Sequence, residues 1–234
     1  IWVEQNSSNV GSLLASADNY VFGGSADVST AILYSDGTMI FSDNAKVDTS
    51  HGDVIGTYTG WDTAHYEYYT STPWYTDRFN ITEVRFNRAT ALSTREWFAE
   101  CTKVTNIDLT NLDTSNVVDM SGMFRMAHYL VHINLSDLNT SSVTTMESMF
   151  AFAQGLTNID ISGFDTRNVT SMRQMFKNCD ALVSIDLSGL DTSNITTMWA
   201  MFSDCTNLMS VNLNNFVIKG NADYMFSGCT HPDL

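Results

Sequence analysis

A phenylalanine recurs every 26 residues through much of this 234-residue chain, and this repeat constrains the fold more than any other feature. The ladder consists of Phe98, Phe124, Phe150, Phe176 and Phe202, followed by Phe226 at a spacing of 24 residues. A Met precedes each Phe from Phe124 onward, and the phrase LDTSN at 112–116 returns with variants at 138–142, 164–168 and 190–194. Repeats in such strict register are typical of a solenoid, in which each unit packs on its neighbours.

The hydrophobic period changes within each unit. Leu156, Ile159 and Ile161 alternate with polar residues, which predicts a short strand, and Ile81, Val84 and Phe86 resemble a degenerate earlier copy. The D-T-S-N phrase then predicts a turn or a helix N-cap. The apolar residues that follow have helical spacing and predict a short helix; in one unit they are Val169, Met172, Met175, Phe176 and Cys179.

The predicted fold class is therefore an α/β solenoid. We expect a leucine-rich-repeat-like, right-handed stack over residues 79–234, with about five to six units that each contain one short parallel strand and one short helix. Residues 1–78 lack the repeat and are predicted to form an N-terminal antiparallel β cap over the first edge of the sheet. Its clearest element is a hairpin over residues 31–41 with Asp36-Gly37 in the turn, and Val54 to Trp61 predicts a further strand.

Three phrases carry a resemblance to a known family: LTNIDIS…MFKNC, LVSIDLS…MFSDC and LMSVNLN…MFSGC. Together with D-T-S-N they resemble the BspA-type leucine-rich repeat of bacterial surface proteins, and most closely its 26-residue, lipoprotein-associated branch. The resemblance spans about Ile81 to Cys229 and implies a location outside the cell or on its surface. Two units depart from the pattern, because Ala127 and Ala153 replace the Cys that other units carry.

Charge and motifs exclude several classes of function. Eleven Lys and Arg against 26 Asp and Glu give a net charge of -15, which disfavours nucleic acid and anionic lipid as partners. No apolar run reaches 18 residues, so we expect no membrane insertion. Phosphate-binding glycine loops, H-E-x-x-H and G-x-S-x-G are absent from the sequence. We therefore expect a monomer that is not an enzyme, with no catalytic residue and no cofactor.

The cysteines and the repeated acids favour structural roles. Cys101, Cys179, Cys205 and Cys229 share one slot three residues after Phe, and Ala in the other units indicates that the slot is small and buried. Their spacing suits no metal site; we expect free thiols in the core, while a disulfide between Cys179 and Cys205 or between Cys205 and Cys229 remains the alternative. One Asp or Asn per D-T-S-N phrase supplies too few oxygens for calcium and favours turn capping.

Two sets of residues are candidates for binding a ligand. The first is the exposed strand face, with Asp108, Asn134, Asp160, Asp186 and Asn212 in one row and His132 beside it. Alternatively, these polar side chains only face water on the surface of the sheet and bind no ligand. The second is the aromatic cluster Trp61, Tyr66, Tyr69 and Trp74, whose rings suit stacking on sugars or anchoring a protein. Its alternative role is packing within the cap and against the first repeat.

The repeat architecture and the absence of an active-site motif, together with the location that the resemblance implies, predict a non-enzymatic bacterial cell-surface or secreted interaction module. Its expected role is adhesion or the binding of host or matrix proteins through the exposed strand face. The first alternative is a rigid structural spacer within a larger surface protein. The second alternative is carbohydrate binding by the aromatic cluster, so the expected partner is a protein or a glycan at the cell exterior.

Overall fold

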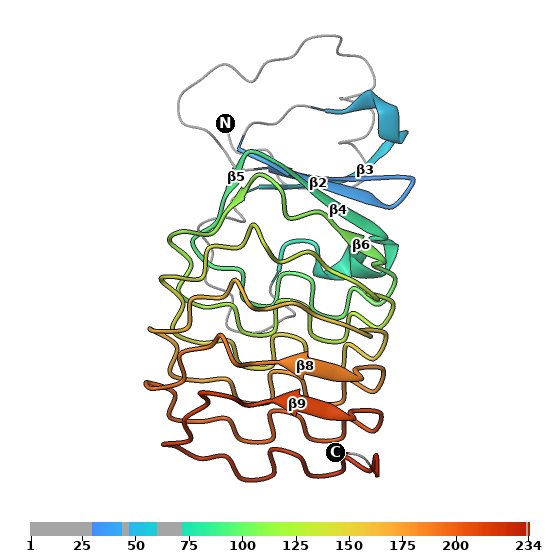
Figure 1. The fold of residues 1–234 in the computed structure, drawn as a ribbon. Helices are drawn as coiled ribbons and strands as arrows, with labels where there is room; N and C mark the ends of the chain where they lie inside the picture. The colour runs from blue at the N-terminus through green and yellow to red at the C-terminus, as the bar shows by residue number, and fades with distance from the viewer. Residues whose placement is uncertain (1–29, 44–46, 60–71, 233) are drawn as a thin grey trace.

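The computed structural model describes residues 30–43, 47–59, 72–232 and 234. In this part of the chain, a β-sheet near the N-terminus leads into a series of coils that lie one on the next (Figure 1). Each coil places its Phe directly against the Phe of the preceding coil, so the 26-residue repeat of the sequence becomes a translation along the stack.

The sheet begins with the predicted hairpin. Strands β1 (Thr30–Tyr34) and β2 (Thr38–Ser42) pair antiparallel, and Asp36 accepts a 2.8 Å hydrogen bond from the Thr38 N–H within the turn. Gly37 has a φ of 90°, a conformation that L-residues with a side chain rarely adopt. Strand β3 (Val54–Thr59) pairs antiparallel with the other side of β1. The structure confirms the hairpin and the strand that starts at Val54.

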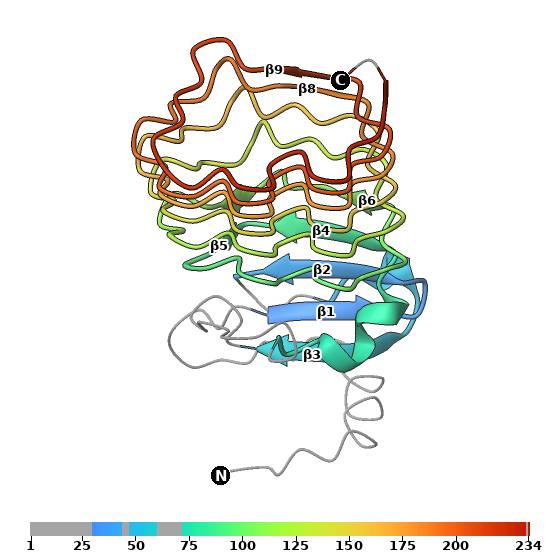
Figure 2. The ribbon, with the colours of Figure 1, turned by 90° about the horizontal axis from the view of Figure 1, so that it is seen from below.

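The same sheet continues into the coils without interruption. Strand β2 pairs in parallel with β4 (Glu83–Asn87), and β4 pairs in parallel with β6 (Asn106–Ile107). The strand order is β3-β1-β2-β4-β6 (Figure 2). The shorter parallel pairs are β5 (Ala89–Thr90) with β7 (Leu112–Asp113), and β8 (Ser184–Asp186) with β9 (Ser210–Asn212).

The prediction of an α/β solenoid with one helix per unit is wrong. Helical structure in the described residues is confined to two 3₁₀ segments ahead of the coils, η1 (Thr49–His51) and η3 (Tyr75–Asn80). The described chain also has no helix with the length and hydropathy to cross a bilayer. The prediction of a strand in every unit is wrong too, because residues 130–135 and 156–161 form none.

Consecutive turns occupy the place of each predicted helix. Alternate N–H groups of residues 120–126 point along the stack and donate to carbonyls of the next coil, with N···O distances of 2.8–3.1 Å. The pairs are Met120 with Thr145, Gly122 with Glu147, Phe124 with Met149, and Met126 with Ala151. The N–H groups of Met123, Arg125 and Ala127 donate to carbonyls three residues back, and the Ser121 N–H donates to Asp119 Oδ1. The backbone N–H groups thus form two kinds of hydrogen bond, those of turns within a coil and those of a ladder between coils.

Backbone torsions explain why no helix forms. Two residues in each of these segments have positive φ; those in three successive coils are Ser148, Phe152, Gln174, Asn178, Ala200 and Asp204, with φ between 54° and 64°. Positive φ is incompatible with a right-handed helix. Three-residue turns nevertheless point side chains inward at i, i+3, i+4 and i+7, which is the spacing of a helical face. The sequence pattern therefore identified the inward side chains correctly and their backbone incorrectly.

A column of stacked phenylalanine rings forms the centre of the core. Ring centroids from Phe124 to Phe226 lie 5.3–5.6 Å apart, with interplanar angles of 1–17°. Both Met ladders are buried beside the rings, for example Met172 and Met175. The column makes each coil depend on its two neighbours, because each interior ring contacts one on either side.

A second buried column consists of threonine hydroxyls from the D-T-S-N phrase. Thr140 Oγ1 accepts a 2.8 Å hydrogen bond from the Asp165 N–H and donates to the Asp165 carbonyl at 3.1 Å. Thr114 and Thr192 make the same pair of bonds to Asn139 and Val217. Each hydroxyl therefore satisfies both backbone groups of one residue in the next coil, which explains a buried Thr at this position.

Candidate functional site: the strand face

The strand face is the outward surface of β2, β4, β6, β8 and β9 and of the equivalent segments 131–134 and 157–160, which form no strand, and it runs from the cap to the last coil. Ile40 of β2 pairs with Arg85 of β4, and the β4–β6 register, Val84 with Ile107, places Arg85 next to Asp108. At the far end of the stack Asp186 pairs with Asn212. The 26-residue repeat places Asn134 and Asp160 at the equivalent positions of the coils in between, so the predicted residues form one column, which we call the acidic column: Asp108, Asn134, Asp160, Asp186 and Asn212.

Residues of the acidic column also stabilise the turns that follow them. Asp160 Oδ1 accepts a 2.9 Å hydrogen bond from the Ser162 N–H, and Asp186 Oδ1 accepts one of 2.8 Å from Ser188. Asp108, Asn134 and Asn212 make the same contact two residues ahead. One oxygen of each side chain is thus used by the fold. The second carboxylate oxygen of each Asp remains a potential acceptor, since an ionised carboxylate accepts at both oxygens.

These hydrogen bonds keep the acidic column charged. The Ser162 hydroxyl and N–H hold the pKa of Asp160 below its usual value, and those of Ser188 do the same for Asp186. The pKa of Asp108 is lowered in the same way by the Thr110 side chain and N–H. His132 lies exposed beside the column, as predicted. Hydrogen bonds to the ionised form favour ionisation, so the face carries fixed negative charge.

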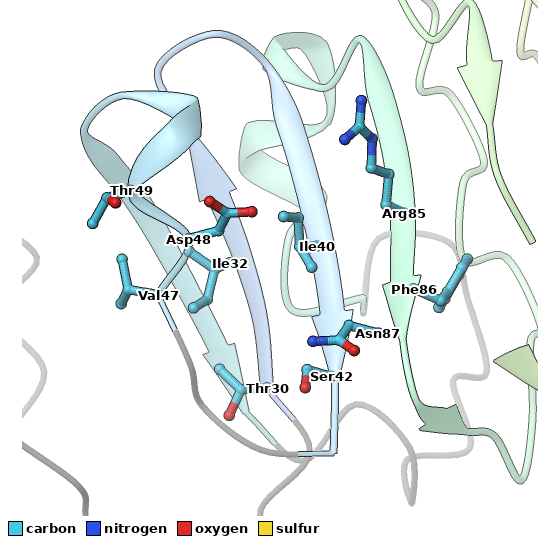
Figure 3. A pocket seen from close by; sticks show the side chains of 10 residues that line it. All are labelled: Thr30, Ile32, Ile40, Ser42, Val47, Asp48, Thr49, Arg85, Phe86 and Asn87. Carbon is cyan, nitrogen blue, oxygen red and sulfur yellow. The ribbon is translucent and has the colours of Figure 1, made fainter. Parts of the chain in front are cut away.

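A hollow of about 590 Å³ lies at the cap end of the same face (Figure 3). Ile32 and Ile40 form an apolar floor, and Asp48, Arg85 and Asn87 supply polar groups around it. The Arg85 guanidinium pairs with Glu83 on the same strand, Nε to Oε1 at 2.8 Å. No sequence pattern predicted this hollow, although the degenerate copy at Ile81-Val84-Phe86 implies that Arg85 is the equivalent of Asp108.

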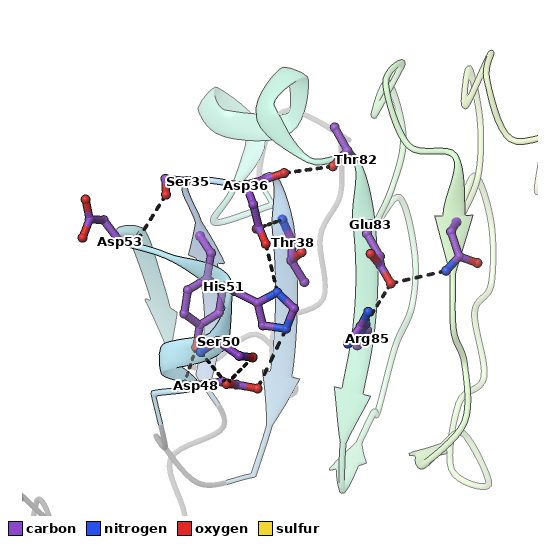
Figure 4. A network of polar contacts seen from close by, with 12 residues as sticks. Ser35, Asp36, Thr38, Asp48, Ser50, His51, Asp53, Thr82, Glu83 and Arg85 are labelled. Carbon is purple, nitrogen blue, oxygen red and sulfur yellow. Dashed lines mark hydrogen bonds and ion pairs between the residues drawn. The ribbon is translucent and has the colours of Figure 1, made fainter.

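Polar contacts fix the position of η1, which forms one wall of the hollow (Figure 4). The Asp48 N–H donates to the Tyr34 hydroxyl at 2.7 Å, and Asp48 caps η1 by accepting from the Ser50 N–H. His51 Nδ1 lies 2.9 Å from Asp36 Oδ2 in the hairpin turn, and its Nε2 lies 3.9 Å from Asp48 Oδ2. These contacts tie η1 to the outer side of β1 and so define one wall of the hollow.

The aromatic cluster does not form the expected surface at Trp74. This side chain is fully buried, its Nε1 donates to the Trp97 carbonyl at 2.7 Å, and its ring packs edge-on against Phe41 at 5.1 Å. The prediction that Trp74 presents an exposed binding ring is therefore wrong, because it packs between the cap and the first coil. Trp61, Tyr66 and Tyr69 lie outside the described residues.

The four cysteines are free, and they form no cluster for chemistry. Cys101, Cys179 and Cys205 are buried as predicted, whereas Cys229 in the last coil is only partly buried. Cys179 Sγ donates to the Phe150 carbonyl at 3.1 Å, and Cys205 and Cys229 make the equivalent contacts with the carbonyls of Phe176 and Phe202. Burial raises the pKa of Cys101 and of Cys205 to about 12. Within the described part of the chain, no group of three or more His, Cys, Asp and Glu is arranged to hold a metal ion.

A stack of coils joined by backbone ladders and sharing one Phe per 26 residues defines a repeat protein. The chain belongs to the family described as "Mycoplasma protein of unknown function, DUF285", whose sequence profile matches residues 92–216 and 161–231, more than half of the chain. The match covers most of the segment that resembles bacterial leucine-rich repeats; the particular lipoprotein-associated branch stays a prediction. No curated protein matches the chain.

A comparison of structures found a crystal structure of a leucine-rich repeat protein from Eubacterium ventriosum ATCC 27560. The alignment covers 88% of this chain and 94% of that chain, with 16% sequence identity and a TM-score of 0.20. This TM-score is too low to establish a shared fold. The assignment of the chain to a family therefore rests on the sequence profile.

Proposed function

We propose that this chain is a non-enzymatic interaction module at the exterior of a bacterial cell, and that it binds its partner through the strand face. The location rests on the resemblance to bacterial surface repeats. The binding role rests on one observation, the continuous exposed face that joins the acidic column to the hollow at Ile32 and Ile40. Repeat proteins use extended surfaces of this kind for recognition because neighbouring units present equivalent positions side by side.

The experiment is a binding screen with the whole chain against immobilised matrix proteins and glycans. Charge reversal in the acidic column, Asp160→Lys, and removal of the neighbouring ring, His132→Ala, should each weaken binding. Asp191→Lys is the matched control, because Asp191 is also exposed and also caps a turn, through the Ser193 N–H at 2.9 Å, but lies outside the strand face. Equal effects of Asp160→Lys and Asp191→Lys would contradict recognition through the strand face.

A rigid structural spacer is the second candidate, and the turn contacts of the acidic column favour it. Each of these side chains has a structural task in its own coil, which accounts for an Asp or Asn there without any ligand. A spacer requires the hydrogen bond by which each of these side chains stabilises its turn, but it does not require their negative charge. The absence of binding to every matrix protein and glycan in the screen, by a chain whose coils are folded, would favour the spacer.

A further inference from the structure

The strand face carries an apolar column in addition to the acidic column. Val131 and Val183 are each 42% exposed and Met209 is 37% exposed, although all three have large apolar side chains. Thr157 lies between them in the stack: its N–H donates to the Val131 carbonyl, as the Met209 N–H does to the Val183 carbonyl. We call Val131, Thr157, Val183 and Met209 the apolar column. They sit one residue before the row that contains His132, at the start of each outward segment.

Small polar residues separate the two columns over the last two coils. Ser184 and Ser210 are exposed and pair with each other in the β8–β9 register, between Val183 and Asp186 on one coil and Met209 and Asn212 on the next. The apolar and acidic positions lie three residues apart, which is about 10 Å along an extended chain. An α-helix with its side chains has a diameter of about 10–12 Å. One helix lying over the serines would therefore contact both columns.

The coil spacing on this face is close to the pitch of such a helix. The coils pair there as parallel strands, which lie about 4.8 Å apart, and an α-helix advances about 5.4 Å per turn. A helix parallel to the stack would meet each coil with one turn, so residues three or four apart would repeat the same contact. An extended strand in this direction would not match, since alternate residues repeat every 6–7 Å.

The negative charge of the strand face indicates that the contacting surface of the partner carries positive charge. Glu83, Asp108, Asp160 and Asp186 supply carboxylates along it, and Arg85 is paired with Glu83. His132 is the other basic side chain in these rows of the described coils. A partner with Lys or Arg opposite the acidic column would be complementary, whereas an acidic partner would be repelled.

We propose that the strand face docks an amphipathic α-helix of a partner protein, with an aliphatic stripe on the apolar column and a basic stripe on the acidic column. This inference rests on the proposed function and deepens it by naming the class of partner. Val131, Val183 and Met209 receive the aliphatic side chains, and the exposed carboxylates of Asp160 and Asp186 receive the basic ones.

The test uses three fluorescent helical peptides of about 18 residues, long enough to pass over about five coils at one coil per turn. The first, made of Leu, Lys and Ala, carries adjacent Leu and Lys stripes. The second has the same composition in an order without stripes, and the third has Glu in place of Lys. Binding to the whole chain is measured by anisotropy at low and at physiological salt.

The striped Lys peptide should bind at least about ten-fold more tightly than the other two, and more weakly as salt rises. The double variant Asp160→Asn and Asp186→Asn should weaken its binding by about three- to ten-fold, since each exposed ion pair contributes modestly. Asn keeps the turn contact, as Asn134 and Asn212 do in their own coils. Val183→Ser should also weaken binding, and the control Asp191→Asn should leave it unchanged.

Two outcomes would overturn the proposal. Equal binding of the striped and unstriped peptides would show attraction by charge alone, and equal effects of Asp186→Asn and Asp191→Asn would place the helix elsewhere. The proposed function fails separately: if the screen finds a glycan or an acidic protein bound through Asp160 and His132, the strand face is a binding surface and the helix proposal is wrong. If neither peptides nor screen partners depend on these residues, both proposals are wrong.

Discussion

The Phe column predicts a large difference in stability between an interior and a terminal substitution. Phe176 is fully buried and stacks on Phe150 at 5.5 Å and on Phe202 at 5.4 Å, with interplanar angles of 1° and 5°. Truncation of a buried Phe to Ala costs about 3–5 kcal/mol through lost burial and the cavity left behind. Because Phe176→Ala also removes two stacking contacts, we expect a value near the upper end, about 4–5 kcal/mol.

Phe226 provides the comparison within the same column. It stacks on Phe202 at 5.6 Å, has no ring beyond it in the described chain, and is only partly buried. Phe226→Ala should therefore cost about 1–2 kcal/mol, less than half the cost at the interior position. Phe176→Leu retains most of the volume and should cost less than about 1.5 kcal/mol.

Urea denaturation followed by tryptophan fluorescence and by circular dichroism measures these differences. Loss of the interior ring weakens both interfaces of one coil, so for Phe176→Ala the two probes should separate, with the C-terminal coils unfolding first. If Phe176→Ala were within about 1 kcal/mol of the unsubstituted protein, far below the expected cost, or if Phe176 and Phe226 were equally sensitive, the stacked column would be refuted.

Three further predictions concern other parts of the coils. Thr140→Val should destabilise the protein by about 2–3 kcal/mol, because it leaves the N–H and the carbonyl of Asp165 without their partner, while Thr140→Ser should be close to neutral in urea denaturation. Arg167 holds the pKa of Asp165 at about 2, so the stability this carboxylate contributes is present above the unfolded pKa of about 3.9 and is lost as the pH falls toward 2. Asp165→Asn should therefore flatten the pH dependence of unfolding between about pH 4 and 2, and an unchanged slope would contradict this. Iodoacetamide at pH 8 should alkylate the partly buried Cys229 before the buried Cys101, Cys179 and Cys205, as resolved by mass spectrometry; rapid alkylation of Cys101 in the folded protein would contradict its burial.

Much of the interior could be predicted from the sequence because repetition removes ambiguity. A single segment such as Met172 to Cys179 suits a buried helix or a series of turns, but the same spacing in successive units shows which side chains point inward. The hairpin was predictable for a different reason, since Asp36-Gly37 places Gly where positive φ is needed. In both cases the signal is local and has a physical cause that one sequence displays.

The backbone between those side chains could not be predicted. Turns with positive φ at Gln174 and Asn178 and a helix give the same inward spacing, and the difference lies in where the N–H groups find acceptors. In a helix they bond four residues back; here the Phe176 N–H bonds to Met201 in the next coil. Only the presence of that coil at the correct distance makes the turns favourable, so the deciding interaction is between units and not within one.

The strand face was predicted in part, and the part that was not predicted lies at the start of each outward segment. Strict alternation places one polar residue between two inward ones, which located Asp160 between Ile159 and Ile161. At the start of the segment two consecutive residues point outward, as Val131 and His132 do, and alternation assigns no role to the first. An apolar side chain there was therefore not recognised as part of the surface.

The fold leaves the character of this surface open. An acidic-column position must accept a hydrogen bond from its own turn, and Asp160 and Asn134 do so equally well while differing by a full charge. An apolar-column position faces solvent and accepts Val183 or Thr157 without a change in the ladder below it. Charge and hydrophobicity can thus be set coil by coil along the stack at little cost to stability, because the buried Phe, Met and Thr columns carry the folding energy. In a repeat chain of this kind, the residues that stabilise the stack of coils are different from the residues that contact a partner.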